Sequence, residues 1–393
     1  MTPHGKFWLH VPLETTPGMQ LSAPPDRRLI VLGLCAQLLE REPYMSFLSS
    51  SVLVIKQWLL FDPLLESDAQ ILLGELRQRL PVVSMNDGAN FRIPDGEPAV
   101  ASNSAYDGSV PTLIPAHLKP APVWDERAGS CCWEAKDVLE LALADCSPVT
   151  DDRLLGALEL YVTSQYDFLP RSLFLAKLTI LDGLAIRTKR NSEVASWIDE
   201  KRKEAEVFGD SALSNALLGL KFESHGVAIR ALVRHAVLSL GGSEAEATRQ
   251  ARAAGRLYKT RSDLAHESSP VKLDQELGLA SQLTRLVLNA AVSNPTILDV
   301  DTGEAASVEC GRQLRARWIA EADAAIRKVM PDCTAVVNAI RRPLVQGQFG
   351  ALIVQLADGC EWRIHQGVAE LLCDEEVERW ASLDESFGAP LLP

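Results

Sequence analysis

One predicted helix, Glu244–His266, carries the residues of this sequence that are best suited to chemistry. On a helical wheel of roughly 100° per residue, its basic residues form one stripe at 3-4-3 spacing: Arg249, Arg252, Arg256 and Lys259. No acidic residue interrupts the sequence between Glu246 and Asp263. Arg261 lies away from the stripe, in the middle of the opposite, apolar face, so the sequence predicts a separate role for it.

The position of Arg261 allows two interpretations. A guanidinium on a packing face needs a carboxylate, backbone carbonyls, an opening to solvent or an incoming anion to compensate its charge. It forms either a salt bridge or a snorkelling contact at a seam between helices, for which Asp182 and Glu223 are both possible carboxylates. Alternatively, Arg261 lines a cleft and receives a phosphate group, which fits its planar fork of donors. The sequence leaves both open.

His266 follows Arg261 by five residues and precedes Pro270, so we expect it at or just beyond the end of the helix. Histidine gains and loses a proton near neutral pH, as general acid–base chemistry on a hydroxyl or a leaving oxygen requires. The alternative for His266 is an ordinary residue at a helix end, without a chemical role.

Around these two residues the sequence resembles the motif of HEPN domains, in particular that of the Apea-like branch. In this motif an Arg and, a few residues later, a His stand at the end of a bundle helix, often after a Leu-Tyr pair. The residues that carry the resemblance are Leu257-Tyr258-Lys259-Thr260-Arg261-Ser262-Asp263-Leu264-Ala265-His266-Glu267. The resemblance extends over roughly Asp151–Ser293, a little over a third of the chain.

The resemblance implies a metal-independent endoribonuclease that uses no cofactor and acts on RNA as a homodimer, with a role in defence or stress response. It implies that Arg261 holds the scissile phosphate and stabilises its developing charge. His266 would transfer protons while the 2′-hydroxyl attacks, which leaves a cyclic phosphate. The basic stripe would then guide the RNA backbone through Arg249, Arg252, Arg256 and Lys259.

Two positions depart from the pattern of active HEPN proteins. Those proteins commonly have Asn, Asp or His directly after the Arg, where this sequence has Ser262. Many have Gly after the His, where this sequence has Glu267, whose charge repels phosphate. Both departures favour the alternative function, a catalytically inactive HEPN module that dimerises or binds RNA or a regulatory protein partner.

No other catalytic or metal-binding pattern stands out in the sequence. It has no P-loop and no Gly-x-Gly-x-x-Gly, Gly-x-Ser-x-Gly or His-Glu-x-x-His motif. None of its eight cysteines forms a Cys-x-x-Cys pair, so we expect reduced thiols rather than a zinc site or a disulfide framework. His225 and His235 lie on or next to one predicted helix, and we interpret both as structural.

Length, charge and hydropathy set limits on the protein class. A chain of 393 residues exceeds one ordinary domain, and 47% hydrophobic residues exclude a mainly disordered protein. The formal net charge of −13 argues against non-specific coating of nucleic acid but allows a local basic cleft. The longest apolar runs, Leu29–Leu39 and Val52–Phe61, are shorter than the roughly 20 residues of a membrane-spanning helix. Without a signal peptide at the N-terminus, the sequence predicts a cytoplasmic protein that does not enter membranes.

The predicted fold is mainly α and has three parts. Residues 1–147 are predicted to form a mixed α/β domain with a proline-rich loop near 90–130. Residues 148–296 are predicted to form an antiparallel helical bundle of HEPN type, and residues 297–393 a small α+β module.

Periodicity and capping residues predict the individual elements. In the bundle, Asp151 is a predicted N-cap and Gly241-Gly242 a predicted helix end, with helices over Arg171–Arg187, Ser192–Phe208, Val227–Leu240, Glu244–His266 and Lys272–Val292. Outside the bundle, the expected elements are a strand over Lys6–Val11, helices over Asp26–Glu40, Glu66–Leu80, Glu309–Met330 and Asp374–Leu383, and a hairpin of Gly350–Leu356 with Glu361–His365.

Overall fold

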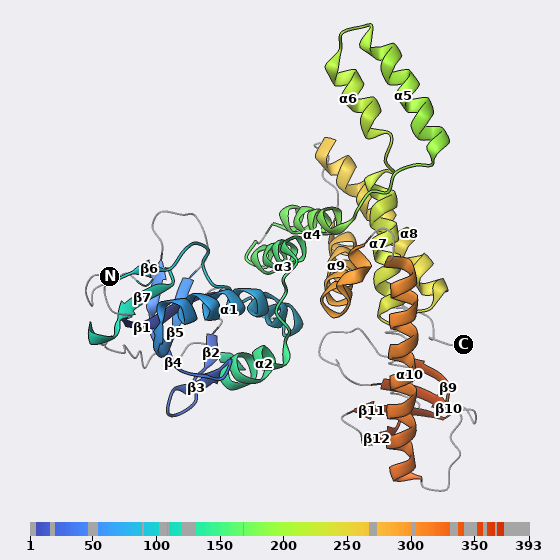
Figure 1. The fold of residues 1–393 in the computed structure, drawn as a ribbon. Coiled ribbons are helices and arrows are strands. Elements are labelled where there is room, and N and C mark those ends of the chain that lie inside the picture. The colour runs from blue at the N-terminus through green and yellow to red at the C-terminus, as the bar shows by residue number, and fades with distance from the viewer. Residues whose placement is uncertain are drawn as a thin grey trace. The chain divides into compact units, whose positions relative to one another are not determined.

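The structure is a computed structural model, which describes residues 5–15, 20–45, 54–88, 90–101, 108, 110–118, 131–167, 169–266, 273–299, 303–330, 337–341, 352–356, 360–365 and 368–372. The chain divides into two compact units, Met1–Ala176 and Lys177–Pro393. The described residues are mainly helical, with additional strands, which confirms a mainly α fold that includes an α/β portion (Figure 1). The three-part division and the HEPN type of the bundle stay predictions.

The first unit is built on a six-stranded sheet with the strand order β3-β4-β5-β1-β7-β6. All neighbouring strands pair antiparallel except β6 and β7, which are parallel. The predicted strand at Lys6–Val11 is confirmed as the start of β1. The bounds of the strands are β1 (Lys6–Thr15), β3 (Arg28–Val31), β4 (Leu34–Met45), β5 (Val54–Leu65), β6 (Ala99–Val100) and β7 (Thr112–Pro115).

The helix predicted over Asp26–Glu40 is wrong, because this segment forms the hairpin of β3 and β4. Along β3, Leu29 and Val31 are buried while Ile30 between them is 52% exposed, which is the period of two that a half-buried strand requires. The apolar residues of the segment also fit a helical wheel, so the spacing alone did not separate the two structures.

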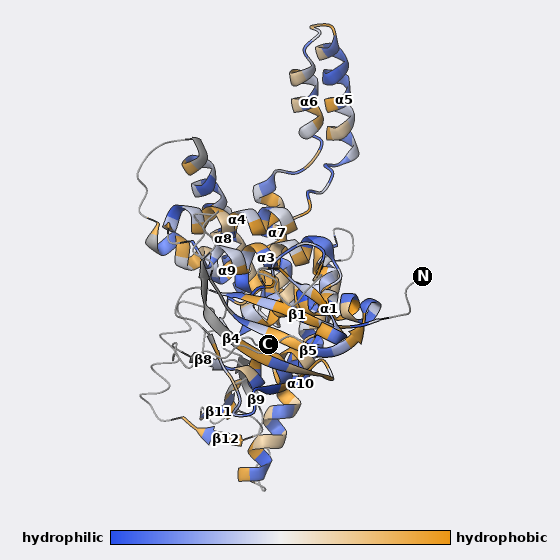
Figure 2. Cartoon of the chain, turned by 90° about the vertical axis from the view of Figure 1, so that its left-hand side faces the viewer, coloured by the Kyte–Doolittle hydropathy of each residue, from blue (hydrophilic) through white to orange (hydrophobic). Residues whose placement is uncertain are grey.

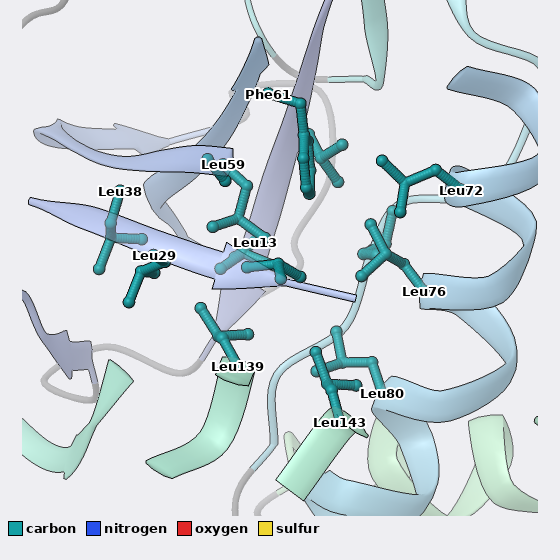
Figure 3. Packing of buried hydrophobic residues seen from close by; sticks show 14 of the residues in the cluster. Leu13, Leu29, Leu38, Leu59, Phe61, Leu72, Leu76, Leu80, Leu139 and Leu143 are labelled. Carbon is teal, nitrogen blue, oxygen red and sulfur yellow. The ribbon is translucent and has the colours of Figure 1, made fainter. Parts of the chain in front are cut away.

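Helix α1 (Glu66–Asn86) packs on the sheet and confirms the helix predicted over Glu66–Leu80. Figure 3 shows the core between them, where Leu13 and Phe61 of the strands face Leu72 and Leu76 of the helix. Further leucines close this core from the π-helix η2 (Lys136–Ala142) and the short α2 (Leu143–Asp145). The first unit therefore has its own apolar core.

The remaining elements of the first unit are short. β2 (Gln20–Ser22) pairs in parallel with β8 (Cys131–Glu134). The predicted proline-rich loop contains β6, β7 and the 3-10 turn η1 (Ala116–Leu118), so it is more regular than expected. Helix α3 (Asp152–Ser164) packs on α1, and Asp151 caps it by accepting a 2.8 Å hydrogen bond from the Leu154 amide, as predicted.

The second unit is centred on helix α7, which contacts α8, α9 and α10. The predicted helices of this region are confirmed with shifts of a few residues at their ends, except that α10 begins at Gly303 rather than at the predicted Glu309. α6 is a helix that the sequence did not predict. The boundary between the units falls within α4. The bounds are α4 (Pro170–Leu184), α5 (Ser192–Glu206), α6 (Ser211–Gly219), α7 (His225–Ser239), α8 (Glu244–His266), α9 (Asp274–Ser293), the 3-10 turn η3 (Pro295–Leu298) and α10 (Gly303–Val329).

Helices α5 and α6 form a hairpin that extends away from α7 and α8 (Figure 1). None of the residues of α6 is buried. Figure 2 shows hydrophobic residues along both helices. On α5, the large side chain of Trp197 is 55% exposed. The missing buried face explains why α6 lacks an amphipathic signal in the sequence.

The last described part of the second unit is a four-stranded antiparallel sheet, β12-β11-β10-β9, that packs on α10. The predicted hairpin is confirmed, since Leu352 of β10 pairs with Ile364 of β11. Between this sheet and α10, Trp318 of the helix and Val354 of β10 belong to one cluster of buried apolar residues. The helix predicted over Asp374–Leu383 lies outside the described residues. The strands are β9 (Val337–Arg341), β10 (Leu352–Leu356), β11 (Glu361–His365) and β12 (Val368–Leu371).

Candidate functional site at the start of helix α7

The two faces of α8 differ as the helical wheel predicts. The basic stripe consists of Arg249, Arg252, Arg256 and Lys259, and all four residues are exposed. None of them makes an ion pair with a residue that the structure describes. The opposite face is buried through Ala247, Ala251, Ala254, Leu257 and Leu264. The stripe is therefore an open positive surface, whereas its RNA contacts stay a prediction.

Arg261 lies on the packing side of α8, apart from the stripe. Its side chain is 30% exposed, and its Nη1 lies 3.5 Å from Oδ2 of Asp182 on α4. Its guanidinium carbon lies 5.6 Å from the ring centroid of Tyr258, three residues earlier on the same helix. Glu223, the other carboxylate considered, pairs with Arg190 at 3.6 Å instead. Of the two interpretations of Arg261, the salt bridge is present, and the guanidinium still reaches solvent.

Asp182 holds a second group through its other carboxylate oxygen. Its Oδ1 lies 2.6 Å from Nδ1 of His225, the first residue of α7. The imidazole of His225 stacks on Tyr258 with 6.4 Å between the ring centroids and 9° between the planes. The carboxylate of Asp182 is 18% exposed and the imidazole 46%. Helices α4, α7 and α8 thus bring Asp182, His225, Tyr258 and Arg261 together; we call these four residues the Asp182 cluster.

The local sequence explains how α7 begins so close to α8. Ser224 caps α7 by accepting a hydrogen bond from the Val227 amide at 3.3 Å, which places His225 in the first helical turn. Gly226 follows, and a Cβ at this position would lie 3.3 Å from Cδ1 of Tyr258. The absence of a side chain at Gly226 therefore lets the first turn of α7 approach the Tyr258 ring.

A short stem brings Asp182 and His225 together although 43 residues separate them in the sequence. The chain leaves α4, forms the α5–α6 hairpin and returns beside itself. The Arg190 amide donates to the Lys221 carbonyl, and the Glu223 amide to the Thr188 carbonyl, both at 2.8 Å. The guanidinium of Arg187 adds a 2.7 Å hydrogen bond to the Glu223 carbonyl. These contacts fix the end of the α4 segment against the start of α7.

His266 is the last residue of α8, so the predicted helix end is correct. The orientation of its side chain lies outside the described structure, and so does all of Glu267. On the helix, five residues correspond to a rotation of about 140° from Arg261. Among the described residues, Arg261 and His225 share two neighbours, Asp182 and Tyr258.

The Asp182 cluster combines groups suited to anion binding and to proton transfer. Asp182 holds Nδ1 of His225, which leaves Nε2 as the nitrogen that would meet a substrate. A carboxylate-held imidazole of this kind is chemically able to accept a proton, and a partly exposed guanidinium is able to bind a phosphate group. Among the described residues, no group of three His, Cys, Asp or Glu side chains is placed to hold a metal ion.

Sequence reasoning did not connect His225 with Arg261 and interpreted it as structural, which stays a prediction, and it named Asp182 as one of two possible partners of Arg261. The one local signal for His225 is Ser224, which predicts a helix start and therefore an accessible position for the next residue. Nothing in the sequence spacing links residues 182, 225 and 261, because their contact depends on tertiary structure.

Comparisons with known proteins add no assignment. No family model matches this sequence. No curated protein and no solved structure matches it either. The function must therefore be argued from the geometry of the described residues and from the resemblance in the α8 segment.

Proposed function

We propose that this protein is a HEPN-type endoribonuclease that cleaves RNA without a metal ion, as a homodimer. The observation that carries the proposal is the state of Arg261, which keeps 30% of its side chain exposed although it lies on the packing side of α8. Its 3.5 Å contact with Asp182 is longer than the roughly 2.8 Å of a strong charge-assisted hydrogen bond, so an incoming phosphate can compete for the guanidinium.

In the proposed reaction, Arg261 binds the scissile phosphate and stabilises the negative charge that develops on it. The 2′-hydroxyl attacks the phosphorus, the bond to the 5′-oxygen breaks, and a cyclic phosphate and a 5′-hydroxyl are formed. His266 takes part as a proton-transfer residue.

The basic stripe supports RNA as the substrate. The stripe lies on the same helix as Arg261 and consists of four exposed cations, namely Arg249, Arg252, Arg256 and Lys259. Each cation that neutralises a backbone phosphate releases counterions, so binding through the stripe must weaken as salt rises. The formal net charge of −13 argues against non-specific coating of nucleic acid and is compatible with a local basic surface.

The test is cleavage of labelled RNA by the purified full chain in the presence of a metal chelator. We expect the wild-type protein to cleave, and Arg261→Ala and His266→Ala each to lower the rate by about a hundredfold or more. Arg317→Ala and His117→Ala are matched controls, because both residues are exposed and lie outside the Asp182 cluster and the stripe. Absence of cleavage by the wild-type chain, or full cleavage by both site variants, contradicts the proposal.

The second candidate function is a catalytically inactive HEPN module that dimerises or binds RNA or a regulatory protein. The ion pair between Asp182 and Arg261 favours the inactive module, since the Asp182 carboxylate already contacts one nitrogen of the guanidinium that would bind phosphate. Gel-shift and sedimentation measurements separate the two functions. Salt-sensitive RNA binding that is lost when the stripe is neutralised, with no cleavage, is the result expected for the inactive module.

A further inference from the structure

We propose that His225, held by Asp182, is the general base of the RNA cleavage reaction and removes the proton from the 2′-hydroxyl. This inference rests on the proposed function and adds to it a proton-transfer group that the α8 motif does not contain. The reaction needs two such groups, one to deprotonate the attacking 2′-hydroxyl and one to protonate the departing 5′-oxygen. His225 takes the first role, which leaves the second to His266.

The orientation of His225 fits a general base. Oδ1 of Asp182 lies 2.6 Å from Nδ1 of the imidazole, so the carboxylate holds the tautomer that carries hydrogen on Nδ1. Nε2 then keeps its lone pair and can accept a proton. It makes no hydrogen bond with any residue in the described part of the chain, and the imidazole is 46% exposed. Substrate can therefore reach it.

The phosphate site and the base share their neighbours. Asp182 contacts His225 through one oxygen and Arg261 through the other. Tyr258 lies against both, with its ring stacked on the imidazole and beside the guanidinium. The guanidinium and the imidazole are therefore neighbours of the same two residues, and the proposal is that a phosphate held by Arg261 brings a 2′-hydroxyl within reach of Nε2.

Charged groups lie near His225 on each element beside it. Asp182 belongs to α4 and Arg261 to α8, and Glu223 precedes the helix and is paired with Arg190. Asp182 is the one carboxylate in hydrogen-bond contact with the imidazole among the described residues. We therefore assign Asp182 as a positioning residue, which acts through His225 and not on the substrate.

Two proton transfers accompany the exchange of bonds at phosphorus, one from the 2′-hydroxyl and one to the 5′-oxygen. His225 accepts the proton of the 2′-hydroxyl through Nε2, and the 2′-oxygen forms its bond to phosphorus. The bond from phosphorus to the 5′-oxygen breaks, and His266 supplies the proton that this oxygen gains. No oxidant, reductant or further reactant enters the reaction.

An RNA substrate with sulfur in place of the bridging 5′-oxygen separates the two roles, because a thiolate leaves without prior protonation. We expect His225→Gln to lower the cleavage rate of the ordinary and the sulfur substrate alike, by about a hundredfold or more. We expect His266→Ala to be slow on the ordinary substrate and to regain most of its rate on the sulfur substrate. His117→Gln serves as the matched control and should cleave both at the wild-type rate.

Two further variants separate a chemical role from a structural one. His225→Gly should regain part of its activity when imidazole is added, which a merely structural contact would not allow. Asp182→Asn should lower kcat without raising KM, because it removes the residue that orients His225 but not the guanidinium that binds phosphate. Far-UV circular dichroism checks that each variant is folded.

The outcomes distinguish this inference from the proposed function. If wild-type protein cleaves neither substrate, both are overturned. If cleavage depends on Arg261 and His266 while His225→Gln retains the full rate, only the role of His225 is overturned. If the sulfur substrate restores His225→Gln instead of His266→Ala, the assignment of His225 as the base is overturned.

Discussion

The two ends of helix α7 lie in opposite environments. At its start, His225 is 46% exposed and surrounded by polar and charged groups. At its other end, Leu238 and Ser239 are buried under α10. The buried end fixes the helix, while the exposed end presents its side chains to solvent in a defined position. Stability and candidate chemistry are thus separated along a single helix.

Close backbone contact stabilises the buried end. Gly241, with φ of 86°, ends the helix in the left-handed region, as its sequence predicts. The guanidinium of Arg315 on α10 donates a 3.0 Å hydrogen bond to the Gly241 carbonyl. A Cβ on Gly311 of α10 would lie 2.0 Å from the Leu238 carbonyl oxygen. The restriction at the exposed end is weaker, because a Cβ on Gly226 would lie 3.3 Å from a ring carbon of the Tyr258 side chain rather than against backbone.

The largest effect on stability is expected at the buried end. Gly311→Ala forces the backbones of α7 and α10 apart, and we expect it to lower the free energy of unfolding by about 1–3 kcal/mol. Urea denaturation measures the change. Gly278→Ala on α9 is the matched control, because a Cβ there meets no atom within 4 Å. The control should stabilise its helix slightly. Equal stability of the two variants would contradict tight packing of α10 against the end of α7.

A smaller effect is expected from His235, in the middle part of α7. Burial lowers the pKa of His235 below its ordinary value of 6.5, against the opposing charge of Glu304. The unfolded chain therefore binds the proton first as the pH falls, so stability is present above pH 6.5 and is lost as the pH falls from there through the lowered pKa.

Urea denaturation between pH 7.5 and pH 5, that is, about one pH unit above and somewhat more than one below the ordinary pKa of histidine, tests this expectation. His235→Gln should flatten the pH dependence, because glutamine does not titrate. His225→Gln is the comparison at the exposed end. A wild-type pH dependence that survives unchanged in His235→Gln would contradict the role of burial at this position.

The smallest effect on stability is expected at the exposed end. Arg261→Gln removes a partly exposed ion pair with a 3.5 Å contact, so we expect the free energy of unfolding to change by less than about 1 kcal/mol. The same substitution should abolish most RNA cleavage. Thermal denaturation and the cleavage assay are measured on one preparation. A large loss of stability would show that Arg261 serves mainly to hold α4 against α8.

The sequence predicted the helices better than the contacts between them. The bounds of α8 and the separate position of Arg261 follow from helical periodicity within one segment. The hairpin of β3 and β4 was mistaken for a helix because its leucines satisfy both periods. The contact of Asp182 with His225 had no local signal, since it depends on a stem that closes a long connection between two helices.

That stem has a consequence for the length of the chain between α4 and α7. Its backbone hydrogen bonds join residues 188 and 190 to residues 223 and 221, and everything between them is carried by the α5–α6 hairpin. The entropy of closing a connection grows only with the logarithm of its length. Shortening or extending this hairpin would therefore change the size of the protein without moving the carboxylate from its imidazole, so the length of the hairpin is not fixed by the Asp182 cluster.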